Sequence, residues 1–294
     1  MKHLLEIDDL SGEDIGAVLD LSEAPTPPQV LAGKGAALVF EKPSLRTRNS
    51  TEMAVVQLGG HPVMIGAAEV GLGSRETPED VIRTLAGYHA VVAARVFEHE
   101  KLERMAALDV VPVVNMLSDT AHPLQALADL LTLRQRFGRL EGLIVAYIGD
   151  ANNVSRSLSF AAALTGITMR LASPPGYQCP DVDADHVRAL GGTIDLFDRP
   201  EDAIAGADAV YTDVWASMGK EEEAEARRRA FEGFTVDSAL LAQAGANAVF
   251  LHCLPAHRGE EVSAELMESE RSLVWKQAEN RMHTARGLLA HLLS

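Results

Sequence analysis

Cysteine is nearly absent from this chain, since only Cys179 and Cys253 occur among its 294 residues. Two cysteines cannot form a disulfide framework, and such scarcity is typical of a reducing compartment. Basic residues are also few, 26 against 42 acidic ones, and the net charge of −16 argues against nucleic acid or an anionic membrane as a partner. No apolar run approaches ~18 residues, the length that crosses a bilayer. Acidic residues follow Met1 too closely for a signal peptide, so we expect a soluble, cytoplasmic protein.

Low-complexity segments and short repeats are absent too, and short apolar runs alternate with helical patterns throughout. This alternation predicts the α/β class, with parallel sheets covered by helices. Strands are expected at 36–40, 62–65, 90–96, 110–115, 143–148, 168–172, 209–212 and 248–251. Four precede residue 120 and four follow residue 140, which favours two domains over one sheet. We place the domains at 1–135 and 136–273, with a last helix at about 274–294 packing back on the first domain.

The junction after the first strand carries a signal for phosphate binding. The apolar run that ends at Phe40 is followed by Ser44, Arg46 and Thr47, and helical spacing begins near Arg46. A helix N-terminus offers unpaired N–H groups and a partial positive charge, and arginine adds forked donors that fit phosphate oxygens. The simpler interpretation is a capped surface helix with solvated arginines.

Polar side chains also follow the other predicted strands. In open α/β sheets, ligands bind beyond the carboxyl ends of the strands. After the first strand, the polar residues at these ends are Arg95, then His122 and Gln125, Asn152 and Asn153, Asp213 and Ser217, and His252 to Pro255. Six clusters at six strand ends predict one site in a cleft between the two domains.

Several segments, in the expected order, resemble the aspartate/ornithine carbamoyltransferase family. Ser44 to Arg48 is similar to the family's Ser-Thr-Arg-Thr-Arg phosphate loop, with Leu45 in place of the usual Thr. His122 to Gln125 is similar to its His-Pro-x-Gln motif. The segments similar to ornithine-binding ones are Gly149 to Val154, Asp213 to Gly219 and His252 to Pro255. The resemblance covers nearly the whole chain.

This resemblance implies transfer of the carbamoyl group from carbamoyl phosphate to the δ-amine of L-ornithine, giving L-citrulline and phosphate, in arginine metabolism. No metal or organic cofactor is implied, because the leaving phosphate is already activated. The first domain would bind carbamoyl phosphate, through Ser44, Leu45, Arg46, Thr47, Arg95, His122 and Gln125, with Leu254 and Arg281 from later in the chain. The second would bind ornithine, through Asn153, Asp213, Ser217, Met218 and Cys253. Arg95, His122 and Cys253 would be catalytic.

The nucleophile needs a neutral amine. The δ-amine of ornithine resembles that of lysine, with a pKa of ~10.4, so the neutral form costs about 4.6 kcal/mol at pH 7. A carboxylate beside it would favour the charged form. We therefore expect Asp213 at the α-ammonium of the substrate, with Asn153, Ser217 and the Met218 backbone nearby, and Cys253 nearest the δ-nitrogen.

Other interpretations remain open. A carbamoyltransferase for putrescine or an acylated ornithine, or a catalytically silent regulatory member of the fold, would have similar motifs. A dinucleotide-binding oxidoreductase is disfavoured, because no predicted strand is followed by Gly-x-Gly-x-x-Gly. Zinc at His252, Cys253 and His257 is disfavoured, because their spacing fits no common zinc site. Arg227 to Arg229 is expected on a solvated helix face.

The resemblance also implies a homotrimer or a multiple of trimers. In the family, the loop that corresponds to 66–77 reaches the site of the neighbouring subunit. Many ornithine-specific members have a Gln in this loop, where this chain has Gly71. We expect Ser74 or Arg75 to make that contact instead, and Arg75 is better suited to a phosphate.

Overall fold

The computed structural model describes residues 2–216 and 223–294. The chain divides into two compact units. Unit 1 comprises the chain up to Leu131 together with Glu279–Ser294, and unit 2 comprises Thr132–Ala278. Both divisions fall within helices, the first inside α6 (Pro123–Phe137) and the second inside α13 (Val274–Leu293). The end of the chain therefore returns to unit 1.

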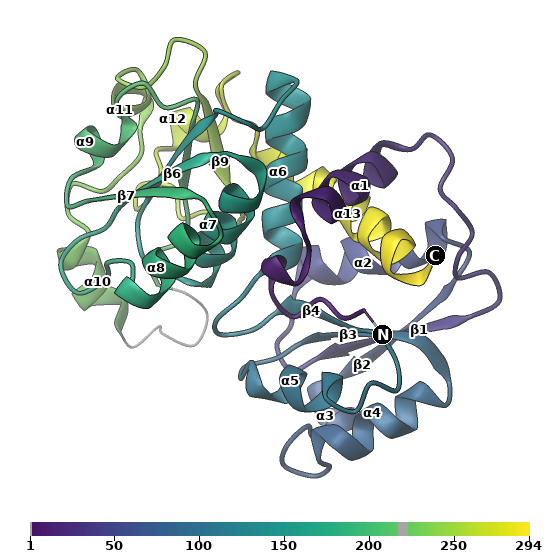
Figure 1. Ribbon diagram of the computed structural model, residues 1–294. Coiled ribbons are helices and arrows are strands. Elements are labelled where there is room, and N and C mark those ends of the chain that lie inside the picture. Colours follow the sequence, from purple (N-terminus) through teal and green to yellow (C-terminus); the bar gives the residue numbers. More distant parts are fainter. Residues whose placement is uncertain (1, 217–222) are drawn as a thin grey trace. The chain divides into compact units, whose positions relative to one another are not determined.

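Unit 1 is built on a four-stranded parallel sheet of order β2-β1-β3-β4. Its strands are β1 (Gly35–Phe40), β2 (His61–Gly66), β3 (His89–Arg95) and β4 (Val113–Leu117). Figure 1 shows α4 and α5 on one face of this sheet and α2 and α13 on the other. The helices of this unit before α6 are η1 (Ile7–Asp9), α1 (Gly12–Glu23), α2 (Leu45–Gln57), α3 (Ala67–Val70), α4 (Pro78–Ala86) and α5 (Glu100–Ala106).

One core of unit 1 lies between the sheet and the pair α4 and α5. Val39 and Ala94 point from the strands to this side, where they join Ile82 and Leu102. These four side chains are fully buried. Burying a side chain of valine or leucine size contributes about 1.5–3 kcal/mol. This packing fixes the carboxyl ends of β1 and β3 as neighbours.

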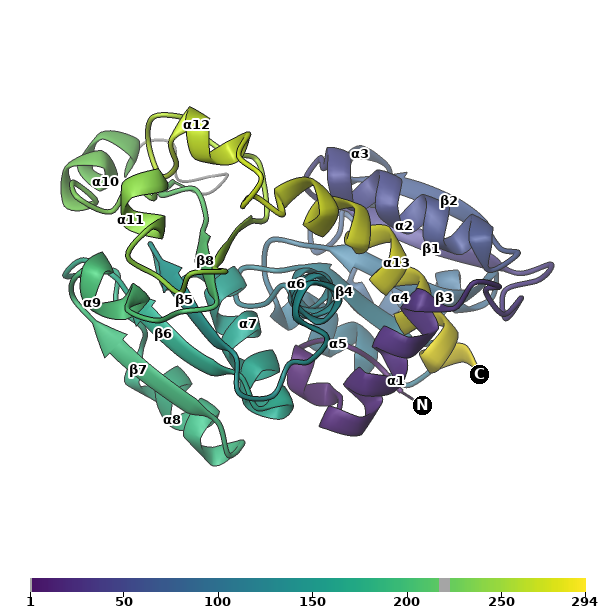
Figure 2. The ribbon, with the colours of Figure 1, turned by 90° about the horizontal axis from the view of Figure 1, so that it is seen from above.

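Unit 2 is built on a five-stranded parallel sheet of order β7-β6-β5-β8-β9. Its strands are β5 (Ile144–Ile148), β6 (Thr168–Ala172), β7 (Thr193–Phe197), β8 (Ala209–Thr212) and β9 (Val249–His252). In Figures 1 and 2, α7 and α8 cover one face and α9 and α11 the other. Between α6 and α13, the described residues of this unit form the helices α7 (Asn153–Thr165), α8 (Asp181–Ala189), α9 (Pro200–Ile204), α10 (Ala224–Ala230), α11 (Ser238–Leu241) and α12 (Ala264–Met267).

The prediction of two parallel sheets covered by helices is confirmed, and the eight predicted strands form with small shifts at their ends. The prediction missed β7, a ninth strand. Only Ile194 of its five residues is buried. β7 is an edge strand with both polar and apolar residues exposed, so burial does not require an apolar run there. The segment at 66–77, expected as a loop, contains the short helix α3.

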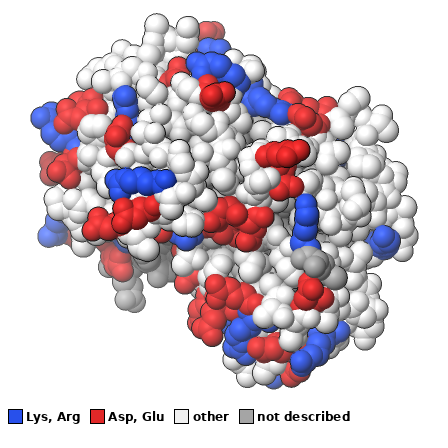
Figure 3. All heavy atoms as spheres, viewed as in Figure 1, with Lys and Arg blue, Asp and Glu red and all other residues white. Residues whose placement is uncertain are grey.

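Charged side chains of both signs are intermixed on the face shown in Figure 3. This pattern accompanies the overall excess of acidic residues. None of the helices within residues 2–216 and 223–294 has the length and apolar character needed to span a bilayer.

Candidate functional site

Each sheet contains one position where the connections of the chain diverge. In unit 1, β1 is followed by β2 on one side and has β3 on the other; in unit 2, β5 lies in the same way between β6 and β8. Such switch points are where open α/β sheets bind ligands. Phe40 pairs with Arg95, and Ile148 pairs with Thr212. The loops that leave these strands therefore start side by side.

In unit 1, the loop after β1 ends at the N-terminus of α2. Ser44 is the N-cap of this helix, and its hydroxyl accepts the Thr47 N–H at 3.2 Å. The first-turn N–H groups of a helix have no partner within the helix and carry its positive dipole end. Leu45, where the family loop has a threonine, has a side chain that is 76% exposed. It brings a backbone N–H to this turn but no hydroxyl.

Two arginines from distant parts of the sequence converge on Thr47. Arg95, at the end of β3, places Nη1 3.3 Å from Thr47 Oγ1, and Arg281, from α13, places Nη2 3.2 Å from the same oxygen. All three residues are buried. Two guanidinium groups beside a helix N-terminus concentrate positive charge, which suits a phosphate or another compact anion.

Gln125 belongs to the same cluster. Its Oε1 accepts a hydrogen bond from Arg281 Nη1 at 2.5 Å, and its Nε2 donates to Asp129 Oδ1 at 2.8 Å. Since both hydrogen bonds are satisfied only in one orientation of the amide, the positions of its oxygen and nitrogen are determined. The amide is buried on α6 beside Arg281.

His122 lies just before α6 and is also buried. Burial first, and then the positive charges of Arg281, Arg95 and Arg46, hold the pKa of His122 well below its usual value of 6.5. The imidazole is therefore neutral at pH 7. A neutral imidazole can donate one hydrogen bond to an oxygen without adding a fourth positive charge to the cluster.

In unit 2, Asp213 follows β8 and gathers hydrogen bonds from three directions. Its Oδ1 accepts from the Cys253 thiol at 3.0 Å and from the Val214 N–H at 2.8 Å, and its Oδ2 accepts from Asn152 Nδ2 at 2.9 Å. Asp213 is buried, so these donors replace the water that a carboxylate would otherwise bind. The cluster joins the ends of β5, β8 and β9.

The amide of Asn152 is oriented by its other partners. Its Oδ1 accepts the N–H groups of Val154 and Ser155 at 2.9 and 3.2 Å, which makes Asn152 the N-cap of α7. The Tyr147 hydroxyl donates to the same oxygen at 3.4 Å. Burial first, and then the negative charge of Asp213, raise the pKa of Tyr147 well above its usual value, so its proton remains available to donate.

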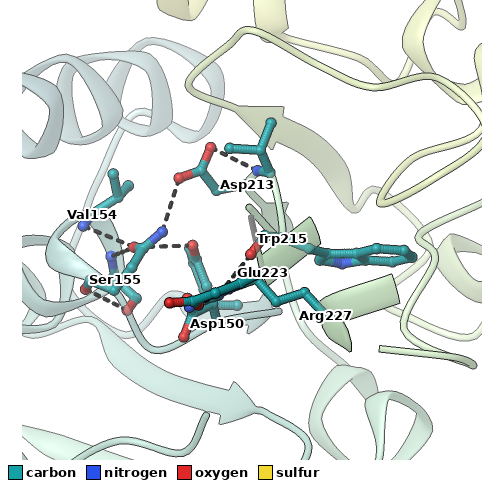
Figure 4. A network of polar contacts seen from close by, with 10 residues as sticks. Asp150, Val154, Ser155, Asp213, Trp215, Glu223 and Arg227 are labelled. Carbon is teal, nitrogen blue, oxygen red and sulfur yellow. Dashed lines mark hydrogen bonds and ion pairs between the residues drawn. The ribbon is translucent and has the colours of Figure 1, made fainter. Parts of the chain in front are cut away.

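Arg227 joins the segment after Asp213 to the loop after β5. Its Nη1 donates to Asp150 Oδ2 at 2.6 Å and to the Trp215 carbonyl at 2.7 Å, and its Nε donates to Glu223 at 2.9 Å. Figure 4 shows the side chains of Asp150 and Glu223 and the backbone of Trp215 close together on one side of Asp213. The guanidinium also lies 4.8 Å from the centre of the Tyr177 ring. The prediction that Arg227 lies on a solvated helix face is wrong.

The sequence offers a signal for this burial. Phe231, four residues after Arg227 and therefore on the same helix face, is fully buried. Arg227 faces the core with it. Arg228 and Arg229 do lie on the exposed side, where they pair with Glu260 and Glu225.

The turn after β9 carries Cys253 and Leu254. His252 accepts the Leu254 N–H on Nδ1 at 2.9 Å, and its Nε2 lies 3.1 Å from Glu261 Oε1. Leu254 has a φ of 61°, in the left-handed region, which costs roughly 1–2 kcal/mol for a residue with a Cβ. Both nitrogens of His252 are committed to protein partners. His252 therefore presents no lone pair to a metal ion beside Asp213 and Cys253.

Two family models match the chain over most of its length. The model described as "Aspartate/ornithine carbamoyltransferase, carbamoyl-P binding domain" matches residues 2–135, and the one described as "Aspartate/ornithine carbamoyltransferase, Asp/Orn binding domain" matches residues 141–292. The chain belongs to the aspartate/ornithine carbamoyltransferase family. The second match runs through Glu279–Ser294 almost to its end, although these residues pack with unit 1.

Relatives within the family match along most of their length. The ornithine carbamoyltransferase of Acidothermus cellulolyticus is 49% identical over 100% of this chain and 97% of its own. Among solved structures, ornithine carbamoyltransferase from Thermus thermophilus has a TM-score of 0.91 at 46% identity, covering 100% of this chain and 99% of that one. The ornithine carbamoyltransferase from Pyrococcus furiosus has a TM-score of 0.93 at 41% identity, covering 98% and 96%.

Two of the residues expected from the family motifs, Ser217 and Met218, lie outside the described residues. A third, Asn153, is the first residue of α7 and is half-buried. Its neighbour Asn152 is the one that donates to Asp213. An Asn immediately before a helical pattern is a capping signal, and that signal distinguishes Asn152 from Asn153.

Two further residues support the family motifs and were not predicted. Asp150, within the segment from Gly149 to Val154, receives Arg227. Glu261, nine residues after His252, binds its imidazole. Glu261 is buried and the adjacent Glu260 is partly exposed, but no sequence pattern tells the two apart. No local signal therefore identifies Glu261.

Proposed function

We propose that this protein transfers the carbamoyl group of carbamoyl phosphate to the δ-amine of L-ornithine, giving L-citrulline and phosphate. The observation that carries the proposal is the convergence of Arg95 and Arg281 on Thr47 at the N-terminus of α2. The names of the relatives, ornithine carbamoyltransferase, support the choice of acceptor. The carboxylate and thiol of unit 2 supply groups that suit an amino acid substrate.

Carbamoyl phosphate binds to unit 1 in this account. Its phosphate lies on the first-turn N–H groups of residues 44–47, with Arg46 and Arg95 supplying positive charge. Because Ser44 Oγ holds the Thr47 N–H in the present state, that one N–H becomes available only if the cap moves aside. Gln125 accepts the carbamoyl NH₂ group on its Oε1, and Arg281 orients that amide.

The transition state places negative charge on the carbonyl oxygen. Thr47, Arg95 and His122 surround this oxygen as donors, and the low pKa of His122 keeps its imidazole a neutral donor. Removing one such donor typically lowers kcat by about 10²–10³. The amine nitrogen forms the new bond to the carbonyl carbon, the bond from that carbon to the phosphate oxygen breaks, and the departing phosphate takes the proton of the amine.

Ornithine binds to unit 2 through Asp213, Asn153, Ser217 and the Met218 backbone. The hydrogen bond from Cys253 to Asp213 refines the roles of these two residues. The Cys253 thiol donates to Oδ1, so on the side of Cys253 this oxygen already has a hydrogen-bond donor. Asp213 then holds the α-ammonium through Oδ2. Cys253 faces the δ-amine, and it stabilises the charged form of that amine less than a bare carboxylate would.

A panel of amines tests the proposal. A colorimetric assay of ureido products with carbamoyl phosphate should show L-ornithine turned over far faster than putrescine or L-aspartate. Putrescine has no α-amino acid group for Asp213 to hold, and the second carboxylate of aspartate would be repelled by Asp213. Comparable turnover of putrescine contradicts ornithine as the acceptor and leaves the family unchanged. No turnover of any amine, with carbamoyl phosphate bound, supports a silent regulatory member.

We also propose a cytoplasmic homotrimer, or a multiple of trimers. A head-to-tail contact closed by three-fold rotation lets one subunit contribute to the site of the next. Leu45, Met53 and Val56 are exposed on α2, and exposed apolar side chains of this size are common at interfaces between copies. Arg75, in the loop at 66–77, has an exposed side chain paired with its neighbour Glu76. An exposed arginine in this loop is suited to reach a neighbouring subunit's phosphate.

A further inference from the structure

The turn after β9 adopts a conformation that its own residues do not favour. Leu254 has a φ of 61°, where a Cβ crowds the backbone. The Leu254 N–H donates to His252 Nδ1 at 2.9 Å. A side chain therefore holds this turn, since leucine has no intrinsic preference for it.

The hydrogen bonds of His252 determine which of its nitrogens carries the proton. The Leu254 N–H can only donate, so Nδ1 must accept and the ring proton must lie on Nε2. Nε2 donates to Glu261 Oε1 at 3.1 Å, and neither side chain is exposed to solvent. The same Oε1 accepts the His257 N–H at 2.6 Å. One carboxylate oxygen thus holds both ends of the loop at 252–257.

Cys253 lies inside this loop. The backbone before it is fixed separately, because the His252 N–H donates to Gln277 Oε1 at 2.9 Å. The backbone after it is held by the Leu254 turn, through the hydrogen bond to the His252 imidazole. The direction of the thiol, which lies 3.0 Å from Asp213 Oδ1, therefore depends on that turn.

We propose that Glu261 is a positioning residue for the nucleophile's site. It keeps His252 in the Nε2–H tautomer, and His252 in turn holds the Leu254 turn that directs Cys253 at Asp213. The consequence for turnover rests on the proposed function, in which Cys253 faces the δ-amine. The consequence for the thiol itself does not.

Glu261→Ala, Glu261→Gln and Glu260→Ala form a matched set. Alanine removes the acceptor, whereas glutamine keeps an amide oxygen in place of Oε1. Glu260 is the adjacent glutamate, is partly exposed and pairs with Arg228, so it controls for loss of charge. Alkylation of Cys253 by iodoacetamide, followed by mass spectrometry of the peptide, reports the thiol. Burial raises the pKa of Cys179 to about 11, so that the second cysteine reacts slowly.

In Glu261→Ala, Cys253 should be alkylated at least about tenfold faster than in the wild type. The kcat/KM for L-ornithine should fall by at least about tenfold. A tenfold change corresponds to about 1.4 kcal/mol. Glu261→Gln should largely restore both values, and Glu260→Ala should match the wild type. The Kd of carbamoyl phosphate, measured by calorimetry, should change much less than kcat/KM, because every residue expected to bind that ligand except Leu254 lies in unit 1.

A purely structural role for Glu261 would lower the Tm while leaving the alkylation rate and kcat/KM of the folded protein at wild-type values, and that result overturns the proposal. Should Glu261→Ala not fold, His252→Gln serves instead. Its amide can still donate to Glu261 but offers no acceptor at the position of Nδ1. Faster alkylation of Cys253 in His252→Gln supports the proposal, and an unchanged rate contradicts it. If the wild type does not carbamoylate L-ornithine, the proposed function fails, and the alkylation rates still decide the role of Glu261.

Discussion

Replacing Arg227 by methionine removes a buried positive charge while keeping much of the side-chain volume. The Asp150 carboxylate and the Trp215 carbonyl then lose a donor that lies 2.6 and 2.7 Å away. Breaking a buried ion pair by removing one partner costs about 3–5 kcal/mol, because the other charge stays buried. The Asp150 side chain is 13% exposed, which allows some hydration, so we expect about 3 kcal/mol.

A loss of this size lowers the Tm by roughly 6–12 °C for a domain of about 150 residues or more. Thermal denaturation at one fixed protein concentration measures it. The control is Arg228→Met, one residue along the same helix, whose pair with Glu260 is exposed and is worth about 0–1 kcal/mol. Asp150→Asn in the Arg227→Met background should recover part of the loss, since it removes the unpaired charge.

Arg227 also holds the Trp215 carbonyl, two residues beyond Asp213. The variant should therefore raise the KM for L-ornithine, by about tenfold for every 1.4 kcal/mol of lost positioning, while the Kd of carbamoyl phosphate is unchanged. If Arg227→Met lowers the Tm no more than Arg228→Met does, the network around Arg227 does not stabilise unit 2 and the reasoning is refuted.

Three further predictions concern other parts of the two sites. Arg46→Ala should weaken carbamoyl phosphate binding in calorimetry. Asp213→Asn should leave that binding near normal and impair ornithine turnover. Loss of carbamoyl phosphate binding in Asp213→Asn would falsify this division of roles. Because the pKa of His122 is lowered in the folded protein, the unfolded chain takes up a proton at this residue before the folded protein does as the pH falls below ~6.5. The free energy of unfolding of the wild type, relative to that of His122→Gln, should therefore be highest above pH 6.5 and fall by up to about 1.4 kcal/mol per pH unit below it. Denaturant titrations at several pH values that show the same pH dependence for both proteins would contradict it. Arg75→Ala and Cys253→Ala subunits, each of low activity, should regain roughly a quarter of wild-type activity when refolded together as mixed trimers, and mixed trimers without added activity would show that Arg75 does not act on a neighbouring subunit.

The sequence predicts the sheets well because their strands are short apolar runs, and the parallel arrangement follows from the alternation with helices. Candidate site residues can be proposed from the sequence in the same way, because Ser44, Asp213 and Cys253 follow strands and Arg95 ends one. The edge strand β7 is harder to find, since an edge strand need not be apolar.

The partners of the site residues are the part that sequence patterns miss. Arg227 and Glu261 each sit in a run of like charges, and only the fold determines which member of the run is buried. Their burial depends on contacts with residues far along the chain, Arg227 with Asp150 and Glu261 with His252. Periodicity detects a buried face, but it does not detect a specific polar partner.

Isotope labelling can follow the carbon–nitrogen bond that the proposed reaction forms. Carbamoyl phosphate labelled with ¹³C at the carbonyl and L-ornithine labelled with ¹⁵N at the δ-position are incubated with the protein, and the product is analysed by NMR. The expected product has a ureido carbon with one-bond coupling to the labelled δ-nitrogen, and inorganic phosphate is released with it. Release of phosphate without such coupling, or carbamoylation at the α-nitrogen, would contradict the proposed reaction.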